Sequence, residues 1–342
     1  MTETSTGRAK WNLFLISLLI LFVELACIRW FPAHVLYLTF FTNLVLLAAF
    51  LGMSLGCLAA QRSFRFFKLT PLLLLAALAI GVGFELWARS VGQKLIEVGD
   101  QRSPELVYFG TEYHAGDLAK FAIPVEAIGA FFFLLITVVF IGLGQELGRA
   151  LNQISNRIQA YTINIFGSVI GIVFFAVLSW FQLPPLAWFL PAVIGLAWFL
   201  FTECPEVSKG LKIASFVGLI ATPLLANVHG LFLQLPKATE RYQTSWSPYY
   251  RIDYLPAPYR DIDVNLLGHQ KMVSRDKRYN ENPGIAYPLP YLLNRHAGGP
   301  PFKNVLIIGA GSGNDVSRAL KWGVEHVDAV GIDSVIAELG TK

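Results

Sequence analysis

Charged residues are scarce in this chain. Of its 342 residues only 15% are Asp, Glu, Lys or Arg, whereas 54% are hydrophobic. Because soluble domains contain about 25% charged residues, the composition predicts a protein that is embedded in a membrane over much of its length.

Cysteine and basic clusters are also scarce. The three cysteines, Cys27, Cys57 and Cys204, form no C-x-x-C pair, so neither a disulfide framework nor a metal site is indicated. The formal net charge is +4, and no basic run is interleaved with aromatic residues. The sequence therefore indicates no nucleic-acid partner.

Long apolar runs fill the first two thirds of the chain. A hydrocarbon layer of about 30 Å needs roughly 20 apolar residues, and seven runs approach that length. They cover residues 11–27, 37–58, 69–87, 123–143, 161–180, 186–201 and 211–233. The first run lacks a small-x-small cleavage site and continues into Glu24 and Arg29, which favours a retained helix over a signal peptide. We predict a transmembrane bundle over residues 1–233, with the lipid bilayer as its partner.

Small and polar residues interrupt these runs. Three G-x-x-x-G pairs permit close helix packing, and the pair at Gly144 and Gly148 is equally compatible with a loop turn. A polar group in lipid is costly, so each polar residue in or beside a run suggests either a function or an internal partner. These residues are Glu24, Asn43, Glu126 and Asn164.

After residue 233 the composition becomes polar and rich in proline. Residues 250–254 and 261–266 alternate apolar with polar side chains, which predicts a small antiparallel β unit within residues 234–300. Residues 305–308 then form a continuous apolar run of the kind that a parallel sheet buries, and a second strand is predicted at 326–333. Residues 301–342 are thus predicted to be the start of an α/β Rossmann-like domain.

A glycine-rich turn lies between the first of these strands and a predicted helix. It contains Gly309, Gly311 and Gly313, whereas the dinucleotide fingerprint G-x-G-x-x-G would need glycine at Asn314. The pattern therefore favours S-adenosylmethionine or a derivative over NAD. A tight turn without a ligand remains the alternative. Asp315 lies either beside the cofactor or simply in the first helical turn, where an acid complements the helix dipole.

The order of these parts resembles the spermidine synthase-like membrane proteins, in which a multi-span bundle precedes a polyamine aminopropyltransferase-type domain. Residues 23–29 resemble that family's E-L-x-x-I-R, residues 246–252 its S-P-Y-x-x-I strand, and residues 268–270 its G-x-Q turn. Residues 49–56 and 161–167 resemble its second and fifth spans, and residues 305–333 its cofactor strand and loop. The resemblance implies that Gln270 lines the cofactor entrance and that decarboxylated S-adenosylmethionine is a second candidate cofactor.

Three departures from this family affect the expected function. Gly331 occupies the position of the acid that binds the ribose hydroxyls, and Asp333 either replaces that acid or caps the following helix. Leucine at position 289 stands where a glutamate would meet an amine substrate. The family's catalytic acid would come from a later strand, so we expect it after Lys342 and expect this chain alone to be inactive.

The resemblance thus implies a membrane-anchored transferase that moves an aminopropyl or methyl group from an S-adenosyl compound to a small amine or other nucleophile. The rival hypothesis is a transporter or scaffold with a vestigial nucleotide-binding sensor.

Orientation gives conflicting expectations. Basic residues in the short connections favour a cytoplasmic N-terminus in an inner membrane, and seven crossings would then place residues after 233 outside. We expect a cytoplasmic C-terminal domain, with one miscounted span or a re-entrant piece in residues 88–122. The alternative is that the last fold is not a working cofactor site.

Overall fold

The computed structural model describes residues 3–41, 43–91, 96–97, 123–227, 242–273 and 287–341. By its contacts the chain divides into two compact units. One contains residues 1–238 together with 265–267, and the other contains residues 239–264 and 268–342.

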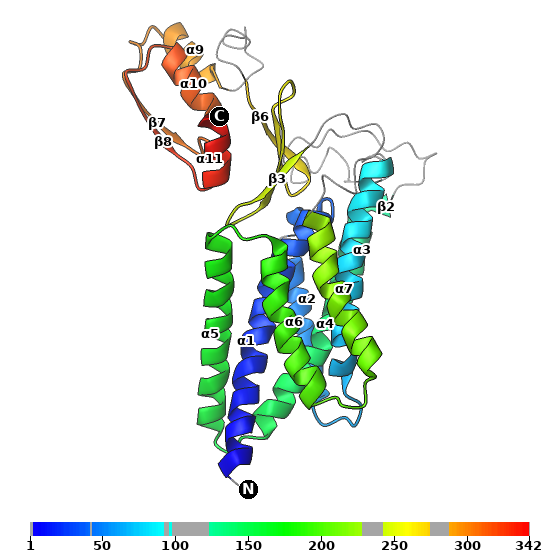
Figure 1. Ribbon diagram of the computed structural model, residues 1–342. Helices are drawn as coiled ribbons and strands as arrows, with labels where there is room; N and C mark the ends of the chain where they lie inside the picture. The colour runs from blue at the N-terminus through cyan, green and yellow to red at the C-terminus, as the bar shows by residue number, and fades with distance from the viewer. Residues whose placement is uncertain are drawn as a thin grey trace. The chain divides into compact units, whose positions relative to one another are not determined.

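The first unit is a bundle of α-helices (Figure 1). Its main helices are α1 (Glu3–His34), α2 (Leu44–Leu58), α3 (Thr70–Val91), α4 (Val125–Asn152), α5 (Arg157–Trp180), α6 (Pro185–Thr202) and α7 (Lys209–Asn227). Short elements accompany them: η1 (Leu38–Phe40), η2 (Phe66–Leu69) and the parallel pair β1 (Ile96–Glu97) and β2 (Ile123–Pro124).

Among the described residues, six helical segments are long and apolar enough to cross a membrane, which is consistent with a multi-pass membrane protein. The exception is α2, whose 15 residues extend about 22 Å. The span predicted at 37–58 is therefore wrong in its first part, because α2 begins at Leu44. Before it, Tyr37 adopts a left-handed backbone conformation with φ 67°, and residues 38–40 form the short η1. The end of the last predicted run, residues 228–233, lies outside the described residues.

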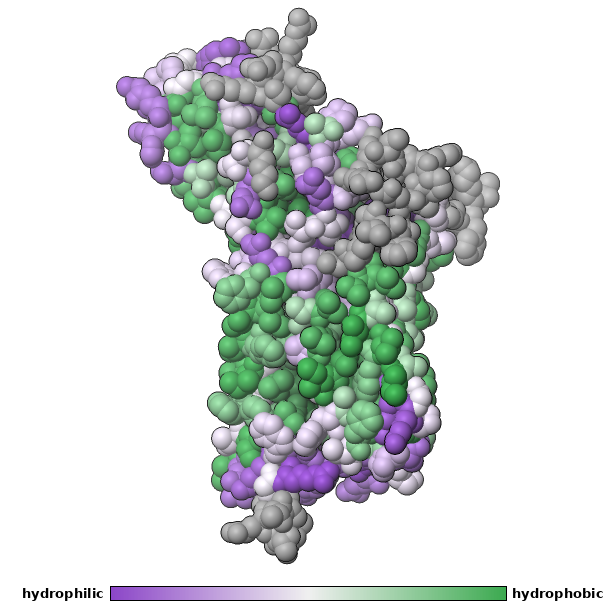
Figure 2. Space-filling model, in the orientation of Figure 1, coloured by the Kyte–Doolittle hydropathy of each residue, from purple (hydrophilic) through white to green (hydrophobic). Residues whose placement is uncertain are grey.

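Large apolar side chains cover the outer surface of the bundle. Figure 2 shows a continuous apolar band over the helices, bounded at the N-terminal end by a hydrophilic rim. Exposed large apolar side chains of these helices include Leu134, Phe166, Ile194, Phe201 and Val217. In water such a band would be unfavourable, whereas lipid tails solvate it.

Glycine brings α2 and α4 into backbone contact. A Cβ atom on Gly52 would meet the Thr137 carbonyl oxygen, and one on Gly56 would meet that of Ile141. From the other side, Gly144 faces the Met53 backbone. The loop-turn alternative for Gly144 and Gly148 is wrong, because both lie in α4 and face α2. The packing role predicted for the glycine pairs is confirmed.

The same contacts give the helix directions. On α2 and α4 the paired residue numbers rise together, so these helices run parallel. Gly167 and Gly171 of α5 face Phe14 and Leu18 of α1 in the same way, so that pair is parallel too. Helices α1 to α7 alternate in direction when the short α2 is counted, and α7 ends at the bundle end opposite the N-terminus (Figure 1). Although α2 is short, it therefore counts as one traverse of the bundle, and the number of traverses stays odd.

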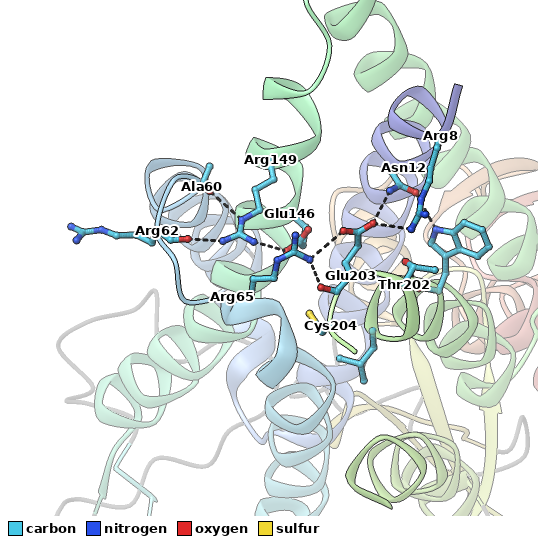
Figure 3. Close-up of polar contacts among 12 residues, drawn as sticks. Arg8, Asn12, Ala60, Arg62, Arg65, Glu146, Arg149, Thr202, Glu203 and Cys204 are labelled. Carbon is cyan, nitrogen blue, oxygen red and sulfur yellow. Dashed lines mark hydrogen bonds and ion pairs between the residues drawn. The ribbon is translucent and has the colours of Figure 1, made fainter. Parts of the chain in front are cut away.

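Polar side chains connect the helix ends beside the N-terminus (Figure 3). The Glu203 carboxylate, just after α6, accepts hydrogen bonds from Arg8 at 3.3 Å, Asn12 at 3.2 Å and Arg65 at 3.2 Å. Arg149 of α4 donates to the carbonyl oxygens of Ala60 at 3.1 Å and Arg62 at 2.6 Å. These bonds hold α1, α4, α6 and the α2–α3 connection together.

The second unit combines two sheets. Strands β3 (Gln243–Trp246), β4 (Arg251–Leu255), β5 (Asp261–Val264) and β6 (Leu267–Lys271) form a sheet in that order, with β3–β4 and β4–β5 antiparallel. The predicted antiparallel β unit is confirmed. Its details differ from the prediction in two places. Asn265 and Leu266 form a two-residue turn with positive φ rather than extending the strand, and residues 268–270 lie within β6 rather than in a turn.

The remaining elements follow in chain order: α9 (Leu289–His296), β7 (Asn304–Ile308), α10 (Asn314–Lys321), β8 (His326–Val330) and α11 (Ser334–Thr341). β7 and β8 pair in parallel, with Val305 opposite Val327. The core beside this pair contains Tyr291, Ala319 and Val324. α11 packs on the antiparallel sheet instead, through Val335 and Ile336 against Ile252 and Ile262.

One face of the parallel pair is exposed, with Leu306 62% and Ile308 82% accessible. A Rossmann-like sheet buries both faces, so the described strands form one β-α-β unit, and the Rossmann-like domain stays a prediction.

We expect Glu203→Ala to destabilise the bundle, because it removes the acceptor shared by Arg8, Asn12 and Arg65. The partly exposed charge-assisted bonds should together contribute about 1–2 kcal/mol. Thermal unfolding in detergent measures this loss. Glu206→Ala is the matched control, since Glu206 is exposed three residues away, and it should change stability by less than about 0.5 kcal/mol. Equal effects of the two variants would contradict the role of Glu203.

Candidate functional site

The glycine-rich turn connects β7 to α10 and is built on left-handed backbone. The φ angles of Gly309, Gly311 and Gly313 are 79°, 53° and 89°. Non-glycine residues adopt this region only at a cost, so the path of the turn depends on these glycines. The amides of Gly309 and Ala310 donate to the Val330 carbonyl at 2.8 and 3.1 Å, which anchors the turn to the end of β8.

Gln270 of β6 is held against this turn. Its side-chain oxygen accepts a hydrogen bond from the Ser312 amide at 3.0 Å. A Cβ atom on Gly311 would approach that oxygen to 2.6 Å, so any side chain at this position would displace Gln270. The structure thus brings together Gln270 and the three glycines, which the sequence predicted as parts of one site.

Asn314 joins the other side of the turn to neighbouring segments by hydrogen bonds. Its side-chain oxygen accepts from the Val273 amide at 3.0 Å, and its Nδ2 donates to the Lys271 carbonyl at 2.8 Å and to the Tyr287 hydroxyl at 3.2 Å. Sequence reasoning used Asn314 only as a departure from the dinucleotide fingerprint and gave it no role. The signal was its position at the start of a helix, where asparagine offers hydrogen bonds that glycine lacks.

Asp333 follows β8 and caps α11. Its Oδ1 accepts from the amides of Val335 at 3.0 Å and Ile336 at 3.2 Å, so the capping interpretation is confirmed. Ribose binding by Asp333 stays a prediction, and only Oδ2 has capacity left for it. Nearby His269 has its pKa lowered by burial, with the charge of Asp333 opposing that shift.

Asp315 lies in the first turn of α10 and is half-buried. Burial raises the pKa of its carboxyl group, and a hydrogen bond from its own backbone amide partly offsets that effect. The carboxylate complements the positive end of α10 whether or not it meets a ligand.

Two buried polar atoms border the turn without partners. Within the described part of the chain, neither Ser312 Oγ nor Asp333 Oδ2 has a hydrogen bond, although both side chains are more than nine-tenths buried. Each such atom costs about 1–3 kcal/mol, so they mark positions where a ligand or water would supply a hydrogen bond. Ser312 is the second residue that sequence reasoning missed.

Gly331 has open space around it. A Cβ atom there would meet nothing within 4 Å, so a side chain can start from this position, just after β8, without a clash at its first atom. No group of metal-ligating residues occurs in the described ranges. No protein-family model, curated protein or solved structure matches this chain.

The glycine turn predicts a difference between two glycine-to-alanine variants. Gly309→Ala introduces only left-handed strain, about 1 kcal/mol. Gly311→Ala should cost about 1 kcal/mol more, because it also displaces Gln270 from Ser312. Denaturant unfolding in detergent measures both. In the Gln270→Ala background the two alanine variants should become equivalent, and an undiminished difference there would show that Gln270 is not the cause.

Proposed function

We propose that this protein is a membrane-anchored S-adenosyl-compound-binding protein of the spermidine synthase-like class. The observation that carries the proposal is the turn itself: three left-handed glycines after a parallel strand, with Gln270 fixed against them. A backbone without Cβ atoms lets a nucleotide approach closely.

The reaction assigned to this class of protein is transfer of an aminopropyl or methyl group from a sulfonium centre to an amine or other nucleophile. Binding would hold the electrophilic carbon and the nucleophile in line, and orientation supplies much of the rate enhancement in such reactions. Gly309, Gly311 and Gly313 would contact the cofactor through their backbone, and Gln270, Asp315 and Asp333 would border it. The proton released by the amine would need a carboxylate to accept it.

The rival function is a transporter or scaffold whose C-terminal unit is a vestigial sensor. Two observations favour it. The Ser312 amide is already satisfied by Gln270, and Asp333 Oδ1 is occupied by the α11 cap. Both leave fewer groups for a ligand than a working cofactor site would offer. Affinity for S-adenosyl compounds distinguishes the two functions.

Replacing Gly331 by glutamate tests the adenosyl site directly. A carboxylate that accepts from both ribose hydroxyls contributes about 1.5–3 kcal/mol per contact, so Gly331→Glu should tighten S-adenosylmethionine binding by about 10- to 100-fold. Isothermal titration calorimetry on the detergent-solubilised protein measures the change. Gly331→Gln, equal in size but neutral, is the control and should gain much less.

An unchanged affinity in Gly331→Glu would have two explanations: Asp333 already binds the ribose, or the turn is not an adenosyl site. The variant Asp333→Asn separates them. Asparagine caps a helix as well as aspartate does, so this variant removes charge while keeping α11. Weaker binding by Asp333→Asn would show that Asp333 already serves the ribose. No binding by any variant would refute the adenosyl proposal.

Membrane topology provides a second test. The proposal requires a cytoplasmic C-terminal unit, because S-adenosyl compounds are made and used in the cytoplasm. A reporter active on only one side of the membrane, fused to the C-terminus, should therefore give a cytoplasmic signal. A signal from the opposite side would exclude the proposed transferase and favour the transporter or scaffold.

A further inference from the structure

The buried face of α1 carries several polar side chains at helical spacing. Positions three and four residues apart share one helix face, and six such positions are each 1% exposed. These residues, named here the α1 seam, are Ser17, Ile20, Glu24, Cys27, Phe31 and His34. Helices α2, α3, α4, α5 and α6 pack around α1.

Both ends of the α1 seam are hydrogen-bonded. Ser17 donates to Asn164 of α5 at 2.8 Å. His34 Nδ1 lies 2.6 Å from Glu85 of α3, and the other oxygen of Glu85 accepts from Arg89 at 3.1 Å. The Arg89 side chain is 35% exposed, so this end of the seam reaches the surface of the bundle.

Glu24 lies between these two groups and differs from them. Its Oε2 is buried without a hydrogen-bond partner, and within the described part of the chain its carboxyl group makes no hydrogen bond or ion pair. It lies seven residues from Ser17, about 10 Å along the helix, and ten residues from His34, about 15 Å.

No opposite charge compensates Glu24 from the helices packed against α1. α2 and α6 carry no Asp, Glu, Lys, Arg or His. On α1 itself the nearest charged residue is Arg29, whose guanidinium donates to Ser179 of α5 at 2.9 Å and lies over the Trp188 ring of α6. α3 carries Glu85 and Arg89, which bind His34 and each other. The charged residues of α4 and α5, all near helix ends, are Glu126, Glu146, Arg149 and Arg157.

An ionised carboxylate buried without a partner is strongly disfavoured, whereas a protonated carboxyl costs much less. We propose that Glu24 is a proton-binding site inside the bundle, neutral in the described state and able to release its proton to water. This second site is independent of the glycine turn. It gives the bundle the group that a proton-coupled membrane process requires, with Ser17 and Asn164 on one side and the His34–Glu85–Arg89 chain on the other.

Infrared spectroscopy of the purified protein in lipid vesicles tests this proposal. Protonated carboxyl groups in apolar surroundings absorb apart from carboxylates, so the wild-type protein should show such a band at neutral pH. Glu24→Gln keeps the size and polarity of the side chain and should remove that band. Glu206→Gln, which changes an exposed carboxylate, should leave it intact.

Reversibility is tested on the same samples. Raising the pH should convert the Glu24 band to carboxylate absorption, and returning to neutral pH should restore it. Labelling by the apolar reagent dicyclohexylcarbodiimide, which adds to protonated carboxyls, should fall at least tenfold in Glu24→Gln. A band absent from the wild type, retained in Glu24→Gln, or unchanged at alkaline pH would overturn the proposal. Conversion by sodium ions at constant pH would also overturn it, in favour of a metal cation.

Discussion

Direct backbone contact between helices is the constraint on which the bundle depends. Lipid offers no hydrophobic drive for helices to associate, so packing must come from close approach. Gly52, Gly56 and Gly144 provide that approach between α2 and α4, and Gly167 and Gly171 provide it between α1 and α5. Because these pairs fix α1 and α4 beside their neighbours, they also bury the α1 seam and hence Glu24. An alanine in either contact would therefore disturb the polar interior as well as the helix surface.

Long apolar runs made the bundle predictable from the sequence, whereas its details depend on contacts distant in the chain. The sequence predicted one span over residues 37–58, because hydropathy carries no information about the left-handed conformation of Tyr37. The glycine pair at Gly144 and Gly148 was equally compatible with a turn until its partner helix was known. For the same reason, the sequence showed that Glu24 was polar in an apolar run. It did not show that Glu24 has no partner among the described residues while Asn164 has one.

In the second unit, local patterns predicted the elements, and tertiary contacts determined what the residues do. The glycine turn, both parallel strands and the antiparallel sheet follow from periodicity and turn chemistry. That Asn314 would bind β6 and Tyr287 depends on a contact across more than 25 residues, which no local pattern contains. From the sequence Asp333 fitted ribose binding and, more often for such a residue, helix capping, and the start of α11 at Ser334 showed that it caps a helix.

Charge at the two ends of the bundle links the proposed functions. The basic residues that connect the helix ends, Arg8, Arg65 and Arg149, lie at the N-terminal end, which the positive-inside rule assigns to the cytoplasm. α7 ends at the opposite end (Figure 1). A cytoplasmic S-adenosyl site after α7 therefore conflicts with this rule as it applies to the described helix ends. A proton-binding Glu24 carries no such requirement, because protons are present on both sides of a membrane. The buried carboxyl group is thus the functional feature of this chain that is compatible with either orientation.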